Sequence, residues 1–268
     1  MWIDDMFGVK KPIIALLHLD PLPGDPAYCG SIEQVFEHAH EDMLALQNGG
    51  VDGLLIANEF SMPYSPETEF STVAAMAYVI GRLKPEIKIP YGVNIILNGA
   101  AAIDLAAATG AQYVRSAFTG AYMGEYGVSV SNNRKAIRRK YELGLKDLKM
   151  FYKVNPESDE YLVSRDIERV AKSIIFNTNV DALCVSGGSS GGETSSELLE
   201  RVRRVANGIP VFCNTGVSID NVQEKMRIAD GACVGTSLKK DGQFWYTRVD
   251  VNRVKTMMEL VKEVRATL

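Results

Sequence analysis

Two stretches near the end of the chain decide the fold: Cys213-Asn214-Thr215-Gly216-Val217 and Val234-Gly235-Thr236-Ser237. Each ends a short apolar run in small, uncharged residues, which favour a tight turn between a strand and a helix. The same order of apolar run, turn and amphipathic stretch occurs eight times in the 268 residues. Eight such units in about 250 residues are typical of a closed (β/α)8 barrel, or TIM barrel.

The eight apolar runs are continuous rather than alternating, which is typical of parallel strands that are covered on both faces. We predict strands at residues 12–19, 51–57, 90–96, 112–117, 147–154, 181–186, 209–213 and 231–235. No linker or low-complexity tract separates them, so we expect one domain over residues 1–268. The structural alternative is an open flavodoxin-like sheet, which would have five or six strands.

Polar signals between the runs predict where helices begin. Ser31 with Gln34, and Thr194 with Glu197, have the spacing of a capping box. An apolar stripe predicts a last helix, with Val254, Met257, Met258 and Val261 on one face. Three connections are longer than a barrel turn requires, at 59–70, 118–132 and 155–164. The first two follow the carboxyl ends of strands, so we expect them to reach over the barrel mouth as substrate lids.

Composition excludes several classes of protein. The net charge is −4 and the longest basic stretch is Arg138-Arg139-Lys140, which argues against nucleic acid as a partner. The longest charge-free segment, 89–103, is too short to span a membrane, and residues 1–9 do not resemble a secretory signal. Three of the four cysteines lie in predicted buried strands without metal-ligand spacing. We therefore expect a reduced cytoplasmic protein, and the sequence leaves a homo-oligomer open.

The carboxyl ends of all eight strands meet at one mouth of such a barrel, where active sites are built. Polar residues stand at each of these ends: His18, Asp20, Asn58, Glu59, Asn94, Asn98, Arg115, Ser116, Lys153, Ser186, Asn214, Thr215, Thr236 and Lys239. Such a ring is suited to holding and protonating a polar metabolite. We therefore predict the active site at this mouth.

The turns after strands six, seven and eight indicate a phosphate site. A phosphate binds backbone N–H groups and helix N-termini, and glycine lets the backbone approach it closely. We predict substrate or phosphate contacts from Ser186, Gly187, Gly188, Asn214, Thr215, Gly216, Gly235 and Thr236, within a glycine-rich run at 187–192 and the two later turns. Ser218 is expected to cap the following helix. The alternative is that these glycines only make tight turns.

Glu59 is the predicted acid–base residue, because it ends strand two, where a water-poor mouth raises a carboxyl pKa. The alternative is a salt bridge to Arg115 or Lys153. His18 is expected either to donate to a developing oxyanion or to be a hydrogen-bonded core histidine. Asn94 and Arg115 are expected to position or polarise the reacting oxygens.

Three further residues are weaker candidates. Asp20 is either a second acid or a brace for its proline-rich turn, and Lys153 either forms a Schiff base or pairs with an anion. Lys239 follows the last strand. We expect no metal centre and no cofactor; His18, Asp20 and Glu59 could at most hold a weak Mg²⁺ through substrate oxygens.

The chain resembles the BtpA/SgcQ family from end to end, and more closely its SgcQ-like branch, which is associated with sugar-uptake genes, than its photosystem I assembly branch. The resemblance rests on residues 7–19, 22–26, 47–53, 58–61, 92–94, 118–122, 181–187, 214–217 and 239–242, including Asn58-Glu59-Phe60-Ser61 and Lys239-Lys240-Asp241-Gly242. It implies a barrel of the ribulose-phosphate-binding type. No catalytic residue is carried over from it, and Asp20 and Lys153 lie outside the matching motifs.

Together these patterns predict an enzyme that acts on a small phosphorylated sugar or related metabolite, as an isomerase, epimerase or lyase. The alternative from another class is a non-catalytic assembly or regulatory barrel. A third hypothesis is a base–sugar hydrolase or lyase in which Glu59 activates water.

Overall fold

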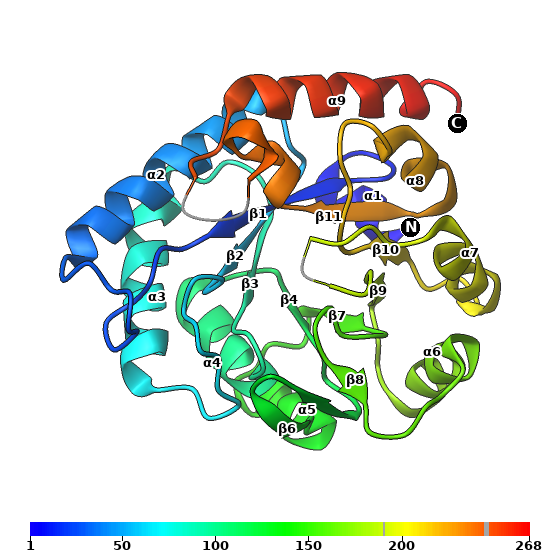
Figure 1. The fold of residues 1–268 in the computed structure, drawn as a ribbon, viewed down its shortest axis with the longest axis horizontal. Helices are drawn as coiled ribbons and strands as arrows, with labels where there is room; N and C mark the ends of the chain where they lie inside the picture. Colours follow the sequence, from blue (N-terminus) through cyan, green and yellow to red (C-terminus); the bar gives the residue numbers. More distant parts are fainter. Residues whose placement is uncertain (190, 244–246) are drawn as a thin grey trace.

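The computed structural model describes residues 1–189, 191–243 and 247–268. Parallel strands close into a barrel and confirm the predicted (β/α)8 fold (Figure 1). Its eight strands are β1 (Ile13–His18), β2 (Gly53–Ala57), β3 (Tyr91–Asn94), β4 (Tyr113–Ser116), β7 (Lys149–Lys153), β9 (Ala182–Val185), β10 (Val211–Cys213) and β11 (Gly231–Val234). Each lies within its predicted range. Because β1 pairs with both β2 and β11, the sheet has no edge and the open-sheet alternative is excluded.

Helices surround the barrel (Figure 1). They are α2 (Ile32–Gly49), α3 (Phe70–Leu83), α4 (Gly99–Thr109), α5 (Asn133–Glu142), α6 (Ile167–Asn177), α7 (Ser196–Val205), α8 (Val222–Ile228) and α9 (Val251–Arg265), with short 3-10 turns η1 (Lys84–Glu86), η2 (Thr236–Leu238) and η3 (Lys240–Gly242). The predicted apolar stripe of α9 is buried. The main core therefore lies between the sheet and the helices.

One of the two predicted capping boxes begins a helix as expected. Ser31 accepts a hydrogen bond from the amide of Gln34 at 3.2 Å, which confirms the start of α2. The prediction for Thr194 was wrong, because the neighbouring Ser195 caps α7 instead. The hydroxyl of Thr194 is buried and donates to the carbonyl of Thr215, so it fastens two mouth turns together.

The prediction that Ser218 caps the helix after β10 was also wrong. The amide of Ser218 donates to the side chain of Asn221, which makes a turn first, and α8 begins only at Val222. Eight residues therefore separate the end of β10 from the start of the helix, and the last four of these, 218–221, form the turn.

A short helix that the sequence did not predict, α1 (Trp2–Phe7), closes the amino-terminal end of the barrel. Its residues Ile3 and Phe7 are buried against the lowest layer of inward-facing side chains: Ile14, Leu55, Tyr113, Phe151, Cys184, Phe212 and Cys233. Gly53 leaves room for α1, since a Cβ at this position would lie 2.6 Å from the ring of Phe7. The opposite mouth is open to a ligand.

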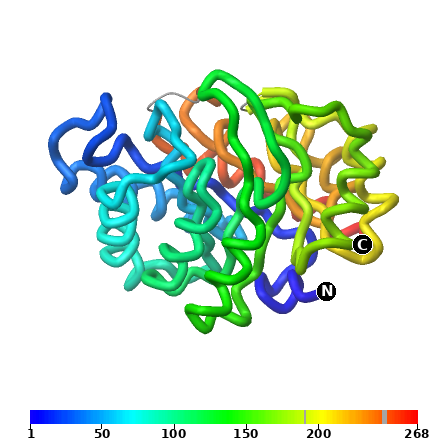
Figure 2. Tube along the Cα trace, turned by 90° about the horizontal axis from the view of Figure 1, so that it is seen from below, coloured from blue at the N-terminus to red at the C-terminus, as the bar shows by residue number. Residues whose placement is uncertain are grey.

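A small antiparallel sheet lies over that mouth. It consists of β5 (Ala121–Gly124), β6 (Gly127–Val130) and β8 (Glu160–Tyr161). Its first two strands come from the predicted loop 118–132 and the third from the connection 155–164, which also follows a strand end. Figure 2 shows the green hairpin of this cap sheet at the end of the molecule opposite to α1. The two connections therefore form a structured cover rather than separate loops.

All four cysteines are free thiols, and Cys184, Cys213 and Cys233 are buried as predicted. Within the described ranges, the helices are each too short or too polar to cross a bilayer.

Candidate active site at the barrel mouth

A cavity of about 700 Å³ opens at the carboxyl ends of the strands, under the cap sheet. Predicted site residues line it: His18, Glu59, Asn94, Arg115, Lys153, Asn214, Thr215, Gly216, Gly235 and Thr236. Three others, Ser186, Gly187 and Gly188, border a separate, smaller hollow beside the loop after β9. The mouth thus brings together most of the predicted site, but it leaves the glycine pair after β9 outside.

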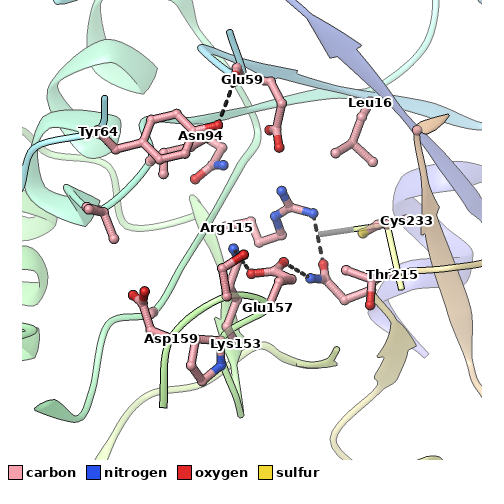
Figure 3. Close-up of a pocket in the computed structure, with 18 of the residues that line it drawn as sticks. Leu16, Glu59, Tyr64, Asn94, Arg115, Lys153, Glu157, Asp159, Thr215 and Cys233 are labelled. Atoms are coloured by element: carbon pink, nitrogen blue, oxygen red, sulfur yellow. Dashed lines mark hydrogen bonds and ion pairs between the residues drawn. The ribbon is translucent and has the colours of Figure 1, made fainter. Parts of the chain in front are cut away.

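Glu59 projects into this cavity from the end of β2 (Figure 3). Its carboxylate lies 3.9 Å from Nε2 of His18, and its side chain is 16% exposed. Burial raises the pKa of Glu59, although the positive charges of Arg115 and Lys153 partly counteract this. The salt bridge considered for Glu59 does not form, because those two cations bind other partners. Glu59 therefore faces the cavity without an ion pair to Arg115 or Lys153.

His18 is buried at the end of β1 and packs edge-on against the ring of Phe60, with centroids 5.9 Å apart. Burial, together with the charges of Lys239 and Arg115, holds the pKa of His18 well below its usual value. The imidazole is therefore neutral at neutral pH. Gly235 allows the last turn to pass beside it, since a Cβ there would lie 3.0 Å from Cε1 of His18.

Two buried nitrogen donors face the same cavity. Nδ2 of Asn94 and Nε of Arg115 have no hydrogen-bond partner within residues 1–189, 191–243 and 247–268. Figure 3 shows Glu59, Asn94 and Arg115 pointing toward one another from neighbouring strands. An unpartnered buried donor is costly and rare in a native protein, so both nitrogens are suited to receive the oxygens of a ligand.

A polar network that the sequence did not predict holds Arg115 in place. Nη1 of Arg115 donates to Oδ1 of Asn214 at 2.8 Å, and Nδ2 of Asn214 donates to Glu157 at 2.7 Å. The other carboxylate oxygen of Glu157 accepts a hydrogen bond from Lys153 at 2.7 Å. Burial alone would raise the pKa of Glu157, but Lys153 and Arg115 together lower it. Glu157 is therefore ionised at neutral pH.

The signal for Glu157 was present in the sequence. It lies in the connection 155–164, which follows the carboxyl end of β7 at the barrel mouth, and its carboxylate lies 2.7 Å from the ammonium group of Lys153. This pairing also settles the position of Lys153, whose ammonium group lies against a carboxylate and not in an apolar pocket.

The turns after β10 and β11 lie side by side in the cavity wall. Gly216 has a left-handed φ of 69°, and a Cβ there would lie 2.2 Å from Cα of Glu193. Four amides of these turns, those of Gly216, Val217, Thr236 and Ser237, have no acceptor in the described part of the chain. All four residues line the cavity. Ser190, in the predicted glycine-rich run, lies outside the described residues.

Arg253 contributes a positive charge to this wall from the first turn of α9. Its Nε donates to the carbonyl of Ser237 at 2.8 Å, and its side chain lines the cavity. Arg253 was missed from the sequence because it lies more than ten residues beyond the last strand. The two turns and Arg253 together form what we call the amide wall: Gly216, Val217, Thr236, Ser237 and Arg253.

Two of the weaker candidates lie behind the cavity. Asp20 accepts hydrogen bonds from His38 at 2.5 Å and Arg248 at 2.7 Å, so it braces the loop after β1. Lys239 is buried with its ammonium 4.5 Å from the ring centroid of Phe60, and burial lowers its pKa to about 8, partly offset by Asp42. Because Asp20 is turned away, it does not join His18 and Glu59 in a cation site. The described residues contain no cluster of three metal-binding side chains.

These features define a (β/α)8 barrel with a largely buried carboxylate, unpartnered donors and an amide wall at the mouth formed by the carboxyl ends of its strands. The BtpA family model matches residues 9–263, and the chain belongs to the BtpA family. It is 44% identical over 266 residues to the sgc region protein SgcQ of Escherichia coli, covering 98% of this chain and 99% of SgcQ.

More distant matches agree with this placement. The photosystem I biogenesis protein BtpA of Synechocystis is 29% identical over 260 residues, covering 96% of this chain and 90% of that protein. Among solved structures, phosphoribosyl anthranilate isomerase from Thermococcus kodakaraensis has a TM-score of 0.57 at 16% identity, covering 94% of this chain and 99% of that chain. At that identity the similarity shows the TIM-barrel fold alone.

Proposed function

We propose that this protein is an enzyme that acts on a small phosphorylated sugar or a related metabolite, by isomerisation, epimerisation or bond cleavage. The observation that carries the proposal is the position of Glu59. It is a buried carboxylate with a raised pKa, in a cavity where two nitrogen donors, on Asn94 and Arg115, lack protein acceptors. Perturbed carboxyl groups that face donors in a cleft are the mark of acid–base sites.

Isomerisation and epimerisation next to a carbonyl group share a first step for which the residues of this site are suited. Ionised Glu59 takes a proton from a substrate carbon next to a carbonyl group, and the electron pair moves to the carbonyl oxygen. Arg115 and Asn94 donate to that oxygen and stabilise its negative charge. Protonated Glu59 then returns the proton to the neighbouring carbon, while a proton moves from the hydroxyl group of that carbon to the former carbonyl oxygen, which gives an isomer. An epimer forms when a second acid protonates the original carbon from its other face. Neutral His18 lies beside Glu59, with its Nε2 3.9 Å from the carboxylate.

The amide wall would hold the phosphate group. Unpartnered backbone N–H groups after β10 and β11, with the guanidinium of Arg253 beside them, supply the donors and charge that an anion needs. In TIM barrels the corresponding turns are a frequent phosphate site. Phosphoribosyl anthranilate isomerase, by its name, acts on a phosphorylated compound, and it shares this fold.

The rival from another class is a barrel that assists assembly without catalysis, as the name of the Synechocystis relative suggests for that protein. A structural role gives no reason to bury Glu59 opposite unpartnered donors. The remaining alternative, a base–sugar hydrolase or lyase, would use the same Glu59 to activate water instead of taking a proton from carbon.

A thermal-shift panel of phosphosugars and their free sugars tests the proposal. A ligand at 100 times its Kd stabilises the fold by about 2.7 kcal/mol, and we expect this only for phosphorylated members. Stabilising compounds are then incubated with the protein, and products are followed by NMR. Glu59→Gln keeps the stabilisation but lowers turnover by about 10²–10⁴-fold, while the exposed control Glu142→Gln changes neither. Equal stabilisation by free sugars, or full turnover by Glu59→Gln, contradicts the proposal.

A further inference from the structure

Part of the cavity wall consists of apolar and aromatic side chains. These side chains have no role in the proposed phosphate site. Its side chains come from the connections after β2 and β3 and from the cap sheet: Met62, Tyr64, Pro66, Ile96, Leu97, Tyr126 and Val130. We call this set the apolar wall. Two of these residues are more exposed to solvent than large apolar residues usually are: Tyr126 is 43% exposed and Val130 is 71% exposed. Apolar surface left open inside a cavity gains free energy when a ligand covers it.

The apolar wall lies across the mouth from the amide wall. In the closed strand order, β3 stands opposite β10 and β4 stands opposite β11. Figure 3 draws Glu59, Asn94 and Arg115 between Tyr64 of the apolar wall and Thr215, the residue directly before Gly216 of the amide wall. A ligand whose phosphate sits on the amide wall, and whose sugar lies against Glu59, therefore points its far end at the apolar wall.

The two tyrosines form an ordered aromatic corner. Their ring centroids are 5.3 Å apart with an interplanar angle of 66°. The hydroxyl of Tyr64 donates to the carbonyl of Glu59 at 2.6 Å, which fixes this ring relative to the acid–base residue (Figure 3). Tyr126 belongs to the turn between β5 and β6, so the cap sheet supplies the second ring. A flat ring packed against this corner has the offset or edge-on contacts that aromatic groups favour.

Leu97 adds backbone strain at the same wall. It has a φ of 63°, in the left-handed region that a leucine rarely adopts. Strained residues of this kind cluster at ligand clamps, where binding benefits from a fixed surface. The next residue, Asn98, caps α4, so the strain is held by the start of a regular helix.

We propose that the substrate is a phosphorylated sugar joined to a flat aromatic ring, with the ring against the apolar wall and the phosphate on the amide wall. This inference rests on the proposed function and narrows its substrate class. The cavity of about 700 Å³ lies within the range of about 300–1,000 Å³ for sites that bury a drug-sized ligand, and exceeds what a phosphosugar alone fills. Between a sugar and a ring, Glu59 and Arg115 would face the bond or carbon that reacts.

The test compares affinities for three kinds of probe by calorimetry: inorganic phosphate, ribose 5-phosphate, and a panel of ribonucleoside 5′-monophosphates with rings of different size. We expect at least one nucleotide to bind about tenfold or more tightly than ribose 5-phosphate. In Tyr126→Ser this ratio falls toward one. Tyr141→Ser, an exposed tyrosine on α5 that does not line the cavity, keeps the ratio of the unaltered protein.

The outcomes separate the two proposals. If ribose 5-phosphate binds and no nucleotide binds more tightly, the aromatic inference is overturned and the phosphosugar function stands. The inference also fails if a nucleotide is preferred but Tyr126→Ser leaves the preference intact. If none of the phosphorylated probes binds, the proposed function fails and the inference fails with it.

Discussion

Oε2 of Glu59 lies 3.9 Å from Nε2 of His18, where β2 and β1 end side by side. The environment shifts the two pKa values in opposite directions, raising that of Glu59 and lowering that of His18, chiefly through burial. Both shifts favour the uncharged forms, so the pair does not behave as a salt bridge. Each of the two groups should therefore change how the stability of the protein depends on pH.

Glu59→Gln should stabilise the protein at neutral pH. Because the folded-state pKa of Glu59 is raised, its ionisation costs stability, and this cost grows as the pH rises through that pKa. The amide cannot ionise, so the variant should unfold at a higher urea concentration at pH 7. The difference should shrink as the pH falls below the usual carboxyl pKa of 4.5. A difference in unfolding midpoint that does not vary with pH would count against the raised pKa.

His18→Gln should change the acid side of the stability profile. The folded-state pKa of His18 is lowered. Near pH 6.5 the unfolded chain therefore binds a proton at His18 that the folded chain does not bind. The unaltered protein should therefore lose stability relative to His18→Gln as the pH falls below 6.5. Urea unfolding between pH 5 and 8 measures this. If the unaltered protein instead gains stability relative to His18→Gln as the pH falls, His18 is charged in the folded state.

Gly216→Ala should be strongly destabilising, by about 2–4 kcal/mol, because it combines a left-handed φ with a backbone collision at 2.2 Å. Gly188→Ala is the matched control. Gly188 lies on the neighbouring turn with open space around its Cβ position, so its change should stay within about 0.5 kcal/mol. Urea unfolding gives both values. Equal effects at the two positions would mean that the close approach to Glu193 is not present in solution.

Asn214→Ala should break the network that holds Arg115. It removes the acceptor of Arg115 and one donor to Glu157, both buried, and should cost about 1–3 kcal/mol. Asn177→Ala, an exposed asparagine on α6, should change stability by no more than about 0.5 kcal/mol. If Asn214→Ala unfolds at the same denaturant concentration as the control, Arg115 and Glu157 do not depend on Asn214.

Much of the fold was predictable because each strand of a parallel barrel is a continuous run of apolar residues in the sequence. All eight strands fall within their predicted ranges, since burial on both faces leaves little room for polar residues. The cap sheet was not predicted, because its strands are short and largely exposed, and the four residues of β6, 127–130, are too few for an alternation to stand out. The short helix α1 was missed because its six residues are too few for a helical period to stand out.

The candidate site was predictable for those residues that directly follow or end a barrel strand. Glu59, Asn94 and Arg115 end neighbouring strands, and the closed barrel brings them together. Glu157 reaches the cavity from a long connection and Arg253 from a helix. A search for polar residues at strand ends therefore does not find them. Asp20 follows a strand end too, but its partners His38 and Arg248 lie 18 and 228 residues away, and no local pattern reveals them.

The most direct test of the central claim, that Glu59 moves a proton on a phosphorylated substrate, is hydrogen–deuterium exchange at the substrate carbon in D₂O. A phosphorylated ligand that stabilises the protein is incubated with it, and loss of carbon-bound proton signals is followed by NMR. We predict that the unaltered protein exchanges a single carbon position, and that Glu59→Gln binds the ligand but exchanges it at least 100-fold more slowly. Equal exchange rates for the two proteins would contradict the account.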